Sequence, residues 1–157
     1  MTEDVAFTAE DLIDHHAIAA VFRNSDDQIL MMRHAKWGFW TIPIGKAHQD
    51  QPPYDGLVEE MRDELGVVVT SAVDTIQAEL EYFREGHPVR LVMHVFEIKS
   101  HAGEIENREP SKHAELRYMT VAEISEQADL SDATLLFLEG EGAHPVAPWT
   151  ARRVDTE

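Results

Sequence analysis

The stretch from Pro53 to Gly66, PYDGLVEEMRDELG, decides the fold because it predicts a short helix with one apolar side. Its large apolar residues recur at helical spacing, at Leu57, Val58, Met61 and Leu65. Proline suits the first position of a helix, and glycine suits the left-handed residue that ends one. We therefore expect a helix that starts at Pro53, is capped by Gly66 and packs its apolar stripe on a sheet.

The acidic residues of this helix share a second face. Glu60 lies three residues before Asp63 and four before Glu64, and residues at these separations are neighbours on a helix surface. Their mutual repulsion would be relieved by Mg²⁺, a cation that prefers oxygen ligands. Such an ion can polarise a phosphoryl oxygen and activate water, while a carboxylate serves as general base. A solvated acidic surface explains the same spacing, so the helix alone leaves both interpretations open.

Strand and helix patterns continue on both sides of this stretch. The predicted strands are residues 15–23, 28–33, 40–44, 67–73, 78–83, 89–98 and 116–119, and the further predicted helices are 121–127 and 132–139. Turn residues 24–27 and 84–88 join two pairs of these strands and predict two β-hairpins. The chain from Gly140 onward is predicted to be an extended or frayed tail. Strands interleaved with helices predict an α/β fold, a mixed sheet with flanking helices.

The helix lies inside a longer motif, from Gly45 to Val67, that resembles the Nudix box. In that family the box runs G-x5-E-x7-R-E-U-x-E-E-x-G-U, where U is aliphatic. Without a gap, the matching positions are Gly45, Glu60, Met61, Asp63, Glu64, Gly66 and Val67. The preceding stretch 39–46, FWTIPIGK, resembles the W-x-x-P-G-G-K lead-in, and 116–124, LRYMTVAEI, resembles the W-V-(S/T)-x-x-E-L ending. The resemblance covers roughly residues 14–140.

Four positions depart from the family pattern. Gln51 stands where the family has its first box glutamate, and Glu59 stands where it has arginine. Asp63 keeps a carboxylate with a shorter reach, and Ile44 replaces the second glycine of the lead-in. The family arginine is credited with supporting the box through charge pairing, so Glu59 is the departure that most directly questions activity.

The resemblance implies a single Nudix domain over residues 1–157, an α/β/α sandwich with its core at about 14–140. It implies a Mg²⁺ or Mn²⁺ site made by Glu60, Asp63, Glu64 and the carbonyl of Gly45. Glu64 and Glu60 are the expected catalytic residues, Lys46 and Arg33 the expected substrate contacts, and Glu115 a possible additional carboxylate. A solvent-exposed loop lysine is the alternative interpretation of Lys46.

The implied activity is hydrolysis of a phosphoanhydride bond in a nucleoside diphosphate linked to another moiety. The expected partners are therefore small nucleotide-type molecules, and a homodimer is possible because dimers are frequent in the family. The departures at Gln51, Glu59 and Asp63 leave an alternative: a catalytically impaired Nudix-fold module that binds nucleotides or regulates.

Composition limits the remaining possibilities. Thirty acidic against thirteen basic residues give a net charge of −17, which disfavours a nucleic-acid partner. The absence of cysteine excludes disulfides and thiolate chemistry. The nine histidines are scattered without H-x3-H or H-E-x-x-H spacing, so no zinc site is expected from them. With no long apolar run and an acidic start, we expect a cytoplasmic protein without membrane contact.

Overall fold

The structure is a computed structural model that describes residues 16–48, 50–84 and 86–154. Its strands are β1 (His16–Val21), β2 (Ile29–His34), β3 (Trp40–Thr41), β4 (Ile44–Ala47), β5 (Val68–Arg84), β6 (His87–Ala102), β7 (His113–Met119) and β8 (Arg152–Arg153). Its helices are α2 (Pro53–Leu65), α3 (Val121–Ser125) and α4 (Asp132–Gly140). None of the helices in these ranges is long and apolar enough to cross a membrane.

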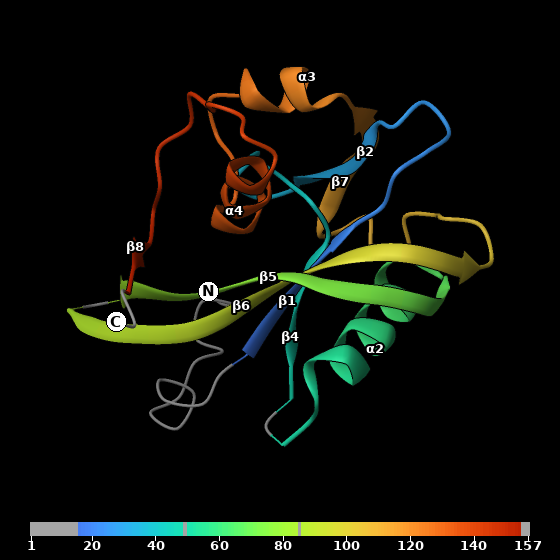
Figure 1. Cartoon of the computed structure of the whole chain (residues 1–157), viewed down its shortest axis with the longest axis horizontal. Coiled ribbons are helices and arrows are strands. Elements are labelled where there is room, and N and C mark those ends of the chain that lie inside the picture. The colour runs from blue at the N-terminus through green and yellow to red at the C-terminus, as the bar shows by residue number, and fades with distance from the viewer. Residues whose placement is uncertain (1–15, 49, 85, 155–157) are drawn as a thin grey trace.

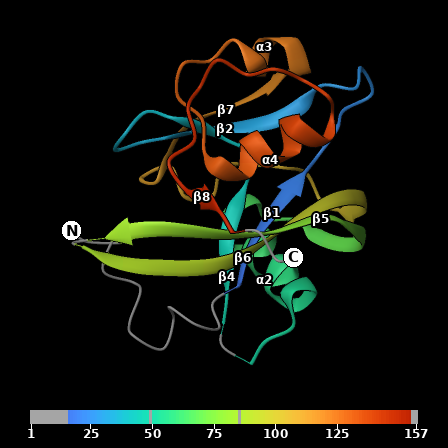
Figure 2. The same cartoon turned by 60° about the vertical axis from the view of Figure 1, so that its left-hand side comes forward.

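Two sheets form the centre of the molecule. The larger sheet has the order β4-β1-β6-β5-β8, and the smaller has the order β3-β2-β7. Strands β1 and β6 run parallel, whereas the other paired strands run antiparallel. Helix α2 covers one side of the larger sheet and α4 lies on the other side, as both views show (Figure 1, Figure 2). The predicted α/β fold, a mixed sheet with flanking helices, is confirmed.

Alternation along β1 divides the apolar core between the two sides of the sheet. Ala17 and Ala19 pack in the cluster that contains α4, whereas Ile18 and Ala20 pack in the cluster that contains α2. On α2 the apolar residues Leu57, Met61 and Leu65 are fully buried in this second cluster. Burial of one such side chain contributes about 1.5–3 kcal/mol, so the stripe fixes which way α2 faces.

The predicted helix at residues 53–66 is confirmed in position and in both ends. Helix α2 starts at Pro53, and Gly66 follows it in the left-handed conformation with φ 74°. The N–H of Gly66 donates to the carbonyl of Arg62 over 3.0 Å. The helices predicted at 121–127 and 132–139 correspond to α3 and α4.

The predicted turn at residues 24–27 is confirmed, but the hairpin that it closes is short. Arg23 and Ile29 form an antiparallel bridge, and the N–H groups of Asn24 and Leu30 donate to the carbonyls of Gln28 and Phe22. Beyond this bridge the two strands separate into different sheets, because β1 pairs with β4 and β6. The predicted start of this strand at His15 lies outside the described residues.

The stretch predicted at residues 40–44 is broken into parts of two strands. Strand β3 ends at Thr41 in the smaller sheet, and β4 begins at Ile44 in the larger one. Pro43 lies between them, lacks an N–H for ladder pairing and gives its carbonyl to the N–H of Ala20 at 2.9 Å. The chain therefore changes sheets at Pro43 and delivers Gly45 to the end of the larger sheet.

The second hairpin is confirmed, and its first strand is longer than predicted. The segments 67–73 and 78–83 join into the single strand β5, whose pairing with β6 shifts register between Asp74 and Ile76. The predicted last strand is confirmed as β7, which starts three residues earlier.

The segment after Gly140 is not frayed over its described length. Strand β8 pairs with β5 at Leu80 and Glu81. Ala147 and Ala151 are buried in the core beside α4, and the side chain of Asp132 accepts hydrogen bonds from Thr150. The Gly and Pro content of this segment predicted an extended or frayed tail, but its small apolar residues pack against the core.

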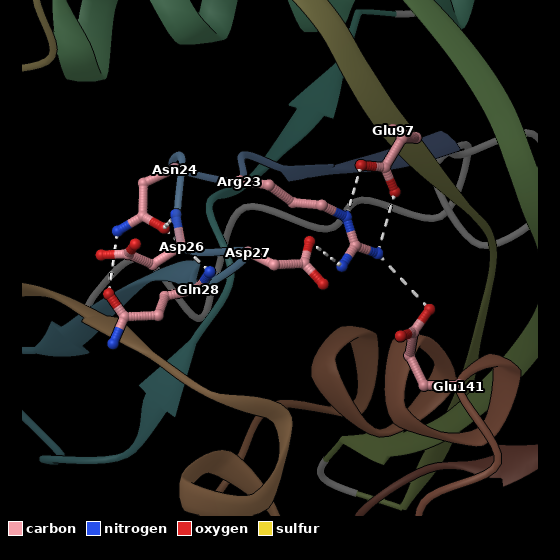
Figure 3. A network of polar contacts seen from close by, with 7 residues as sticks. All are labelled: Arg23, Asn24, Asp26, Asp27, Gln28, Glu97 and Glu141. Carbon is pink, nitrogen blue, oxygen red and sulfur yellow. Dashed lines mark hydrogen bonds and ion pairs between the residues drawn. The ribbon is translucent and has the colours of Figure 1, made fainter.

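A network around Arg23 ties α4 to the sheet (Figure 3). The guanidinium donates to Glu97 on β6, with Nε 2.8 Å from Oε2, and to Glu141 at the end of α4, with Nη2 3.4 Å from Oε2. It also lies 3.3 Å from Asp27 in the turn that follows β1. These carboxylates raise the pKa of Arg23 above its already high ordinary value. The network therefore joins three elements through one fixed cation.

Candidate metal and catalytic site

Glycine at position 45 lets Glu60 of α2 lie directly against β4. A Cβ added to Gly45 would lie 2.5 Å from Cγ of Glu60 and 2.7 Å from its Cδ, closer than real atoms approach. The helix thus presents Glu60 to the backbone of Gly45, as the sequence motif implied for a shared cation site. Ala47, two residues on, is close to Gly56 in the same manner and brings β4 against α2.

Glu60 and Glu64 form a carboxyl pair in which each side chain shifts the pKa of the other. The Glu64 side chain is 8% exposed, and Glu60 is half-buried beside it. Burial raises the pKa of Glu64 to about 9, and the hydrogen bond and charge of Glu60 and the charge of Glu109 add to this. Burial also raises the pKa of Glu60. Both shifts favour a proton on this pair, in a place that a cation can take.

Asp63, the third predicted carboxylate of the helix, is exposed. Its negative charge is one of the causes that raise the pKa of Glu60. The structure therefore brings Glu60 and Glu64 together and leaves Asp63 at the open side of the pair. Its role as a metal ligand stays a prediction.

Two further residues, Glu109 and His113, meet Glu64 and were not expected from the sequence. One ligand atom from each of the three lies within 4.8 Å of the others. Glu64 Oε1, Glu109 Oε1 and both ring nitrogens of His113 are buried without a hydrogen-bond partner. Burial lowers the pKa of His113, so its ring is neutral near pH 7. Unpartnered carboxylate oxygens beside a neutral imidazole fit the donor set of a divalent cation.

The segment before β7 is held to α2 by its backbone. The N–H of Arg108 donates to the carbonyl of Glu64 at 2.9 Å, and the N–H of Glu106 donates to that of Leu65 at 3.0 Å. These bonds satisfy carbonyls that a helix end leaves unpaired. The signal that could have revealed the cluster is E-x3-H at 109–113, directly before a predicted strand.

The two most serious departures from the Nudix box contact each other. Nε2 of Gln51 donates to Oε1 of Glu59 at 3.0 Å, and Oε1 of Gln51 accepts from the N–H of His48 at 2.8 Å. His48 Nε2 is also 3.5 Å from Oε1 of Glu59. Where the family pattern has an acid and a base at these positions, this chain has an amide donor and a carboxylate acceptor. This hydrogen bond links the loop before α2 to the helix.

The other predicted site residues, Glu115, Arg33 and Lys46, lie on strands of the two sheets. Glu115 is opposite Arg33 in the β2–β7 register, with 3.6 Å between Oε1 and Nε, and it accepts hydrogen bonds from Arg117. Lys46 is half-buried on β4 directly after Gly45. The carboxylate from outside the box that approaches Glu64 is Glu109, whereas that of Glu115 is already paired with two arginines. The roles predicted for Lys46, Arg33 and Glu115 stay predictions.

The chain is similar to known proteins in both sequence and fold. The profile of the NUDIX domain matches residues 14–138. A MutT-like protein of Streptomyces ambofaciens is 29% identical over 130 residues, which cover 82% of this chain and 79% of that protein.

Two solved structures illustrate the similarity of the fold. The MutT NUDIX hydrolase from Burkholderia pseudomallei has a TM-score of 0.64 at 22% identity, over 80% of this chain and 96% of that one. An Ap4A hydrolase from C. elegans has a TM-score of 0.59 at 14% identity, over 82% and 96% of the two chains.

The chain belongs to the Nudix family, since the domain profile spans most of its length. The resemblance stated from the box is thereby confirmed. Membership and the MutT-like relatives support the prediction of a Nudix pyrophosphohydrolase. Nudix enzymes use divalent cations and act on small nucleotide-type substrates, and the acidic cluster around Glu64 fits this chemistry.

Proposed function

We propose that this protein hydrolyses a phosphoanhydride bond in a nucleoside diphosphate linked to another moiety, with Mg²⁺ or Mn²⁺ as its cofactor. The observation that carries this proposal is the buried Glu60–Glu64 carboxyl pair, packed against Gly45 and left with an unpartnered oxygen. Burial of a carboxyl group costs free energy, and such groups are found most often where they bind a ligand or take part in a reaction.

Glu60, Asp63, Glu64 and the carbonyl of Gly45 are the residues that would hold the cation. When bound, the ion neutralises charge on the phosphate oxygens and lowers the pKa of bound water. Loss of the proton shared by Glu60 and Glu64 frees both carboxylates as ligands. Lys46, directly after Gly45, and Arg33 would reduce the repulsion between a highly acidic protein and an anionic substrate.

The chain's own carboxylates would also move the proton of the attacking water. Water attacks phosphorus, the bridging P–O bond breaks, and the departing phosphate keeps the bonding electrons. The proton released by water passes to a carboxylate, for which Glu64 and Glu109 are the candidates because their oxygens lie within 4.8 Å of a common group. Positioning and charge stabilisation supply most of the rate gain in such reactions.

The Gln51–Glu59 hydrogen bond supports an intact site. Loss of a functional constraint would leave the two departures unrelated, whereas here each side chain is the partner of the other. This contact is an argument against the alternative of an impaired nucleotide-binding module. The predicted single domain, homodimer and cytoplasmic location stay predictions.

The test is a turnover assay with a matched variant. The protein is incubated with Mg²⁺ or Mn²⁺ and NTPs, nucleotide sugars, ADP-ribose, NADH and dinucleoside polyphosphates, including Ap4A, for which the C. elegans structure is named. We expect turnover of at least one substrate that falls about a hundredfold or more in Glu64→Gln. The control Glu126→Gln, an exposed acid beside α3, should retain it. Binding without turnover across the whole panel would support the nucleotide-binding module instead.

A further inference from the structure

We propose that Glu64, Glu109 and His113 form a mixed oxygen–nitrogen cation site that prefers Zn²⁺ or Co²⁺ to Mg²⁺. The site shares Glu64 with the proposed hydrolase centre, and in this respect the inference rests on the proposed function. Imidazole is a ligand suited to zinc and to other late first-row metals, whereas Mg²⁺ is bound by oxygen. His113 therefore adds a selectivity that the acidic helix face does not have.

The three donors lie close enough to converge on a single ion. His113 Nε2 lies 3.9 Å from Glu64 Oε1, and the whole set lies within 4.8 Å. Two ligands bound to one tetrahedral ion at about 2.0–2.1 Å are about 3.4 Å apart. The donors are wider apart than this, so binding an ion requires the three side chains to rotate toward one another.

The buried polar atoms without partners concentrate at this place. Five such side-chain atoms occur among the described residues, and four of them belong to Glu64, Glu109 and His113. The His113 side chain is 10% exposed, yet neither of its ring nitrogens has a hydrogen bond. A buried imidazole ordinarily uses at least one nitrogen, so this ring is aimed at the acids without a contact that explains it.

Backbone contacts hold the three donors before any ion arrives. The segment that carries Glu109 is bonded to the end of α2 through the N–H of Arg108, 2.9 Å from the Glu64 carbonyl. The N–H of His113 donates to the carbonyl of Glu109 at 3.0 Å, which closes a tight turn between the two ligands. Ligands fixed by the backbone lose little freedom on binding.

Lys112 is the protein cation nearest to this set, and it is easily displaced. Its Nζ lies 3.7 Å from Glu109 Oε1, and its side chain is 67% exposed. A lysine with this exposure can turn into solvent when a divalent ion binds. The other titratable neighbours include the acids Glu60 and Asp63, whose charge attracts a cation, and His34, which lies opposite His113 in the β2–β7 register.

The test measures metal binding without nucleotide. Wild type, His113→Gln and the control His144→Gln, an exposed histidine, are titrated with Co²⁺ by visible absorption and with Zn²⁺ and Mg²⁺ by calorimetry. We expect wild type and the control to bind Zn²⁺ and Co²⁺ more tightly than Mg²⁺. His113→Gln should lose about tenfold or more in Zn²⁺ and Co²⁺ affinity, with a much smaller change for Mg²⁺.

A second measurement keeps the proposal testable if His113→Gln does not fold. Zn²⁺ should shift the ring nitrogen signals of His113 in the wild-type protein, followed by ¹⁵N NMR. Zn²⁺ affinity no higher than that for Mg²⁺, or unshifted His113 signals at saturation, would overturn the site.

Failure of the two proposals can be told apart. Zinc binding through His113 in a protein that turns over nothing in the panel would overturn the hydrolase and keep this site. Turnover with Mg²⁺, together with a Zn²⁺ affinity that does not change in His113→Gln, would support the hydrolase and overturn this site.

Discussion

Two groups of carboxylates in this protein are built in opposite ways. Asp27, Glu97 and Glu141 surround the guanidinium of Arg23, which bonds or lies close to all three (Figure 3). Glu60, Glu64 and Glu109 meet with no such central cation among the described residues: the exposed Lys112 forms an ion pair with Glu109, and burial raises the pKa of Glu60 and Glu64. A carboxylate group that contains its counterion stabilises the fold, whereas one that lacks it is suited to a cation from solution.

The largest effect is expected from a substitution at Gly45, the glycine against which Glu60 of the second group packs. Gly45→Ala would place a Cβ 2.5 Å from Cγ of Glu60 and force that side chain away from β4. We expect kcat/KM to fall by about a hundredfold, because a displaced ligand misplaces the reacting groups. Glu126→Gln, a change at an exposed acid, is the control and should retain activity. Full activity in Gly45→Ala would show that Glu60 does not need this position.

The next largest effect is expected when Arg23, the cation inside the first group, is removed. Arg23→Met leaves Glu97 and Glu141 facing each other without their counterion, and we expect a loss of about 1–3 kcal/mol in the free energy of unfolding. Urea denaturation measures it, and Mg²⁺ affinity should stay unchanged. A weakened Mg²⁺ affinity in this variant would contradict the separation of the two groups.

The third effect concerns pH. The pKa of Glu64 is raised from 4.5 to about 9, so the folded chain keeps a proton that the unfolded chain releases. Stability from this group is therefore full below pH 4.5 and declines as the pH rises toward about 9. Without metal, Glu64→Gln should be more stable than wild type at about pH 8, and a gain of about 1 kcal/mol would raise Tm by about 2–4 °C.

The same linkage predicts how metal acts on stability. Mg²⁺ or Mn²⁺ should raise the wild-type Tm more at about pH 8 than at about pH 6, because binding replaces the proton. In Glu64→Gln this difference between the two pH values should be much smaller. An equal rise at both pH values in wild type would contradict the assignment of the shared proton to this pair.

The smallest effect is expected from substitutions at Gln51 and Glu59, which form a hydrogen bond with each other. Gln51→Glu alone places two acids together, and we expect it to cost about 0.5 kcal/mol, since Glu59 is half exposed. Adding Glu59→Arg should recover that loss. A double-mutant cycle by thermal denaturation measures the coupling. Additive changes would show that the two positions do not interact in solution.

Local sequence predicted the parts of the fold that local physics decides. The apolar spacing of α2, its proline start and Gly66 set that helix without reference to the rest of the chain. The first hairpin is shorter than predicted because an alternating strand pattern does not specify which strands its edges take, and β1 pairs with β4 and β6 along its length. Edge choice depends on the whole sheet, which a short pattern does not contain.

The candidate site divides in the same way. Glu60 and Glu64 were predicted because both lie on one turn of one helix. Glu109 and His113 were missed because only the chain reversal before β7 brings them to α2, and their burial is a tertiary property. Gln51 and Glu59 were treated as separate departures because their contact crosses from a loop to a helix.

The backbone bonds from Arg108 and Glu106 to the end of α2 have a consequence for how this chain can vary. Both contacts use main-chain N–H groups, which every residue except proline supplies. These two bonds therefore require no particular side chain at either position, whereas they do fix the number of residues from Arg108 to His113. An insertion or deletion there would displace Glu109 and His113 from Glu64, so this loop must keep its length as well as those two side chains.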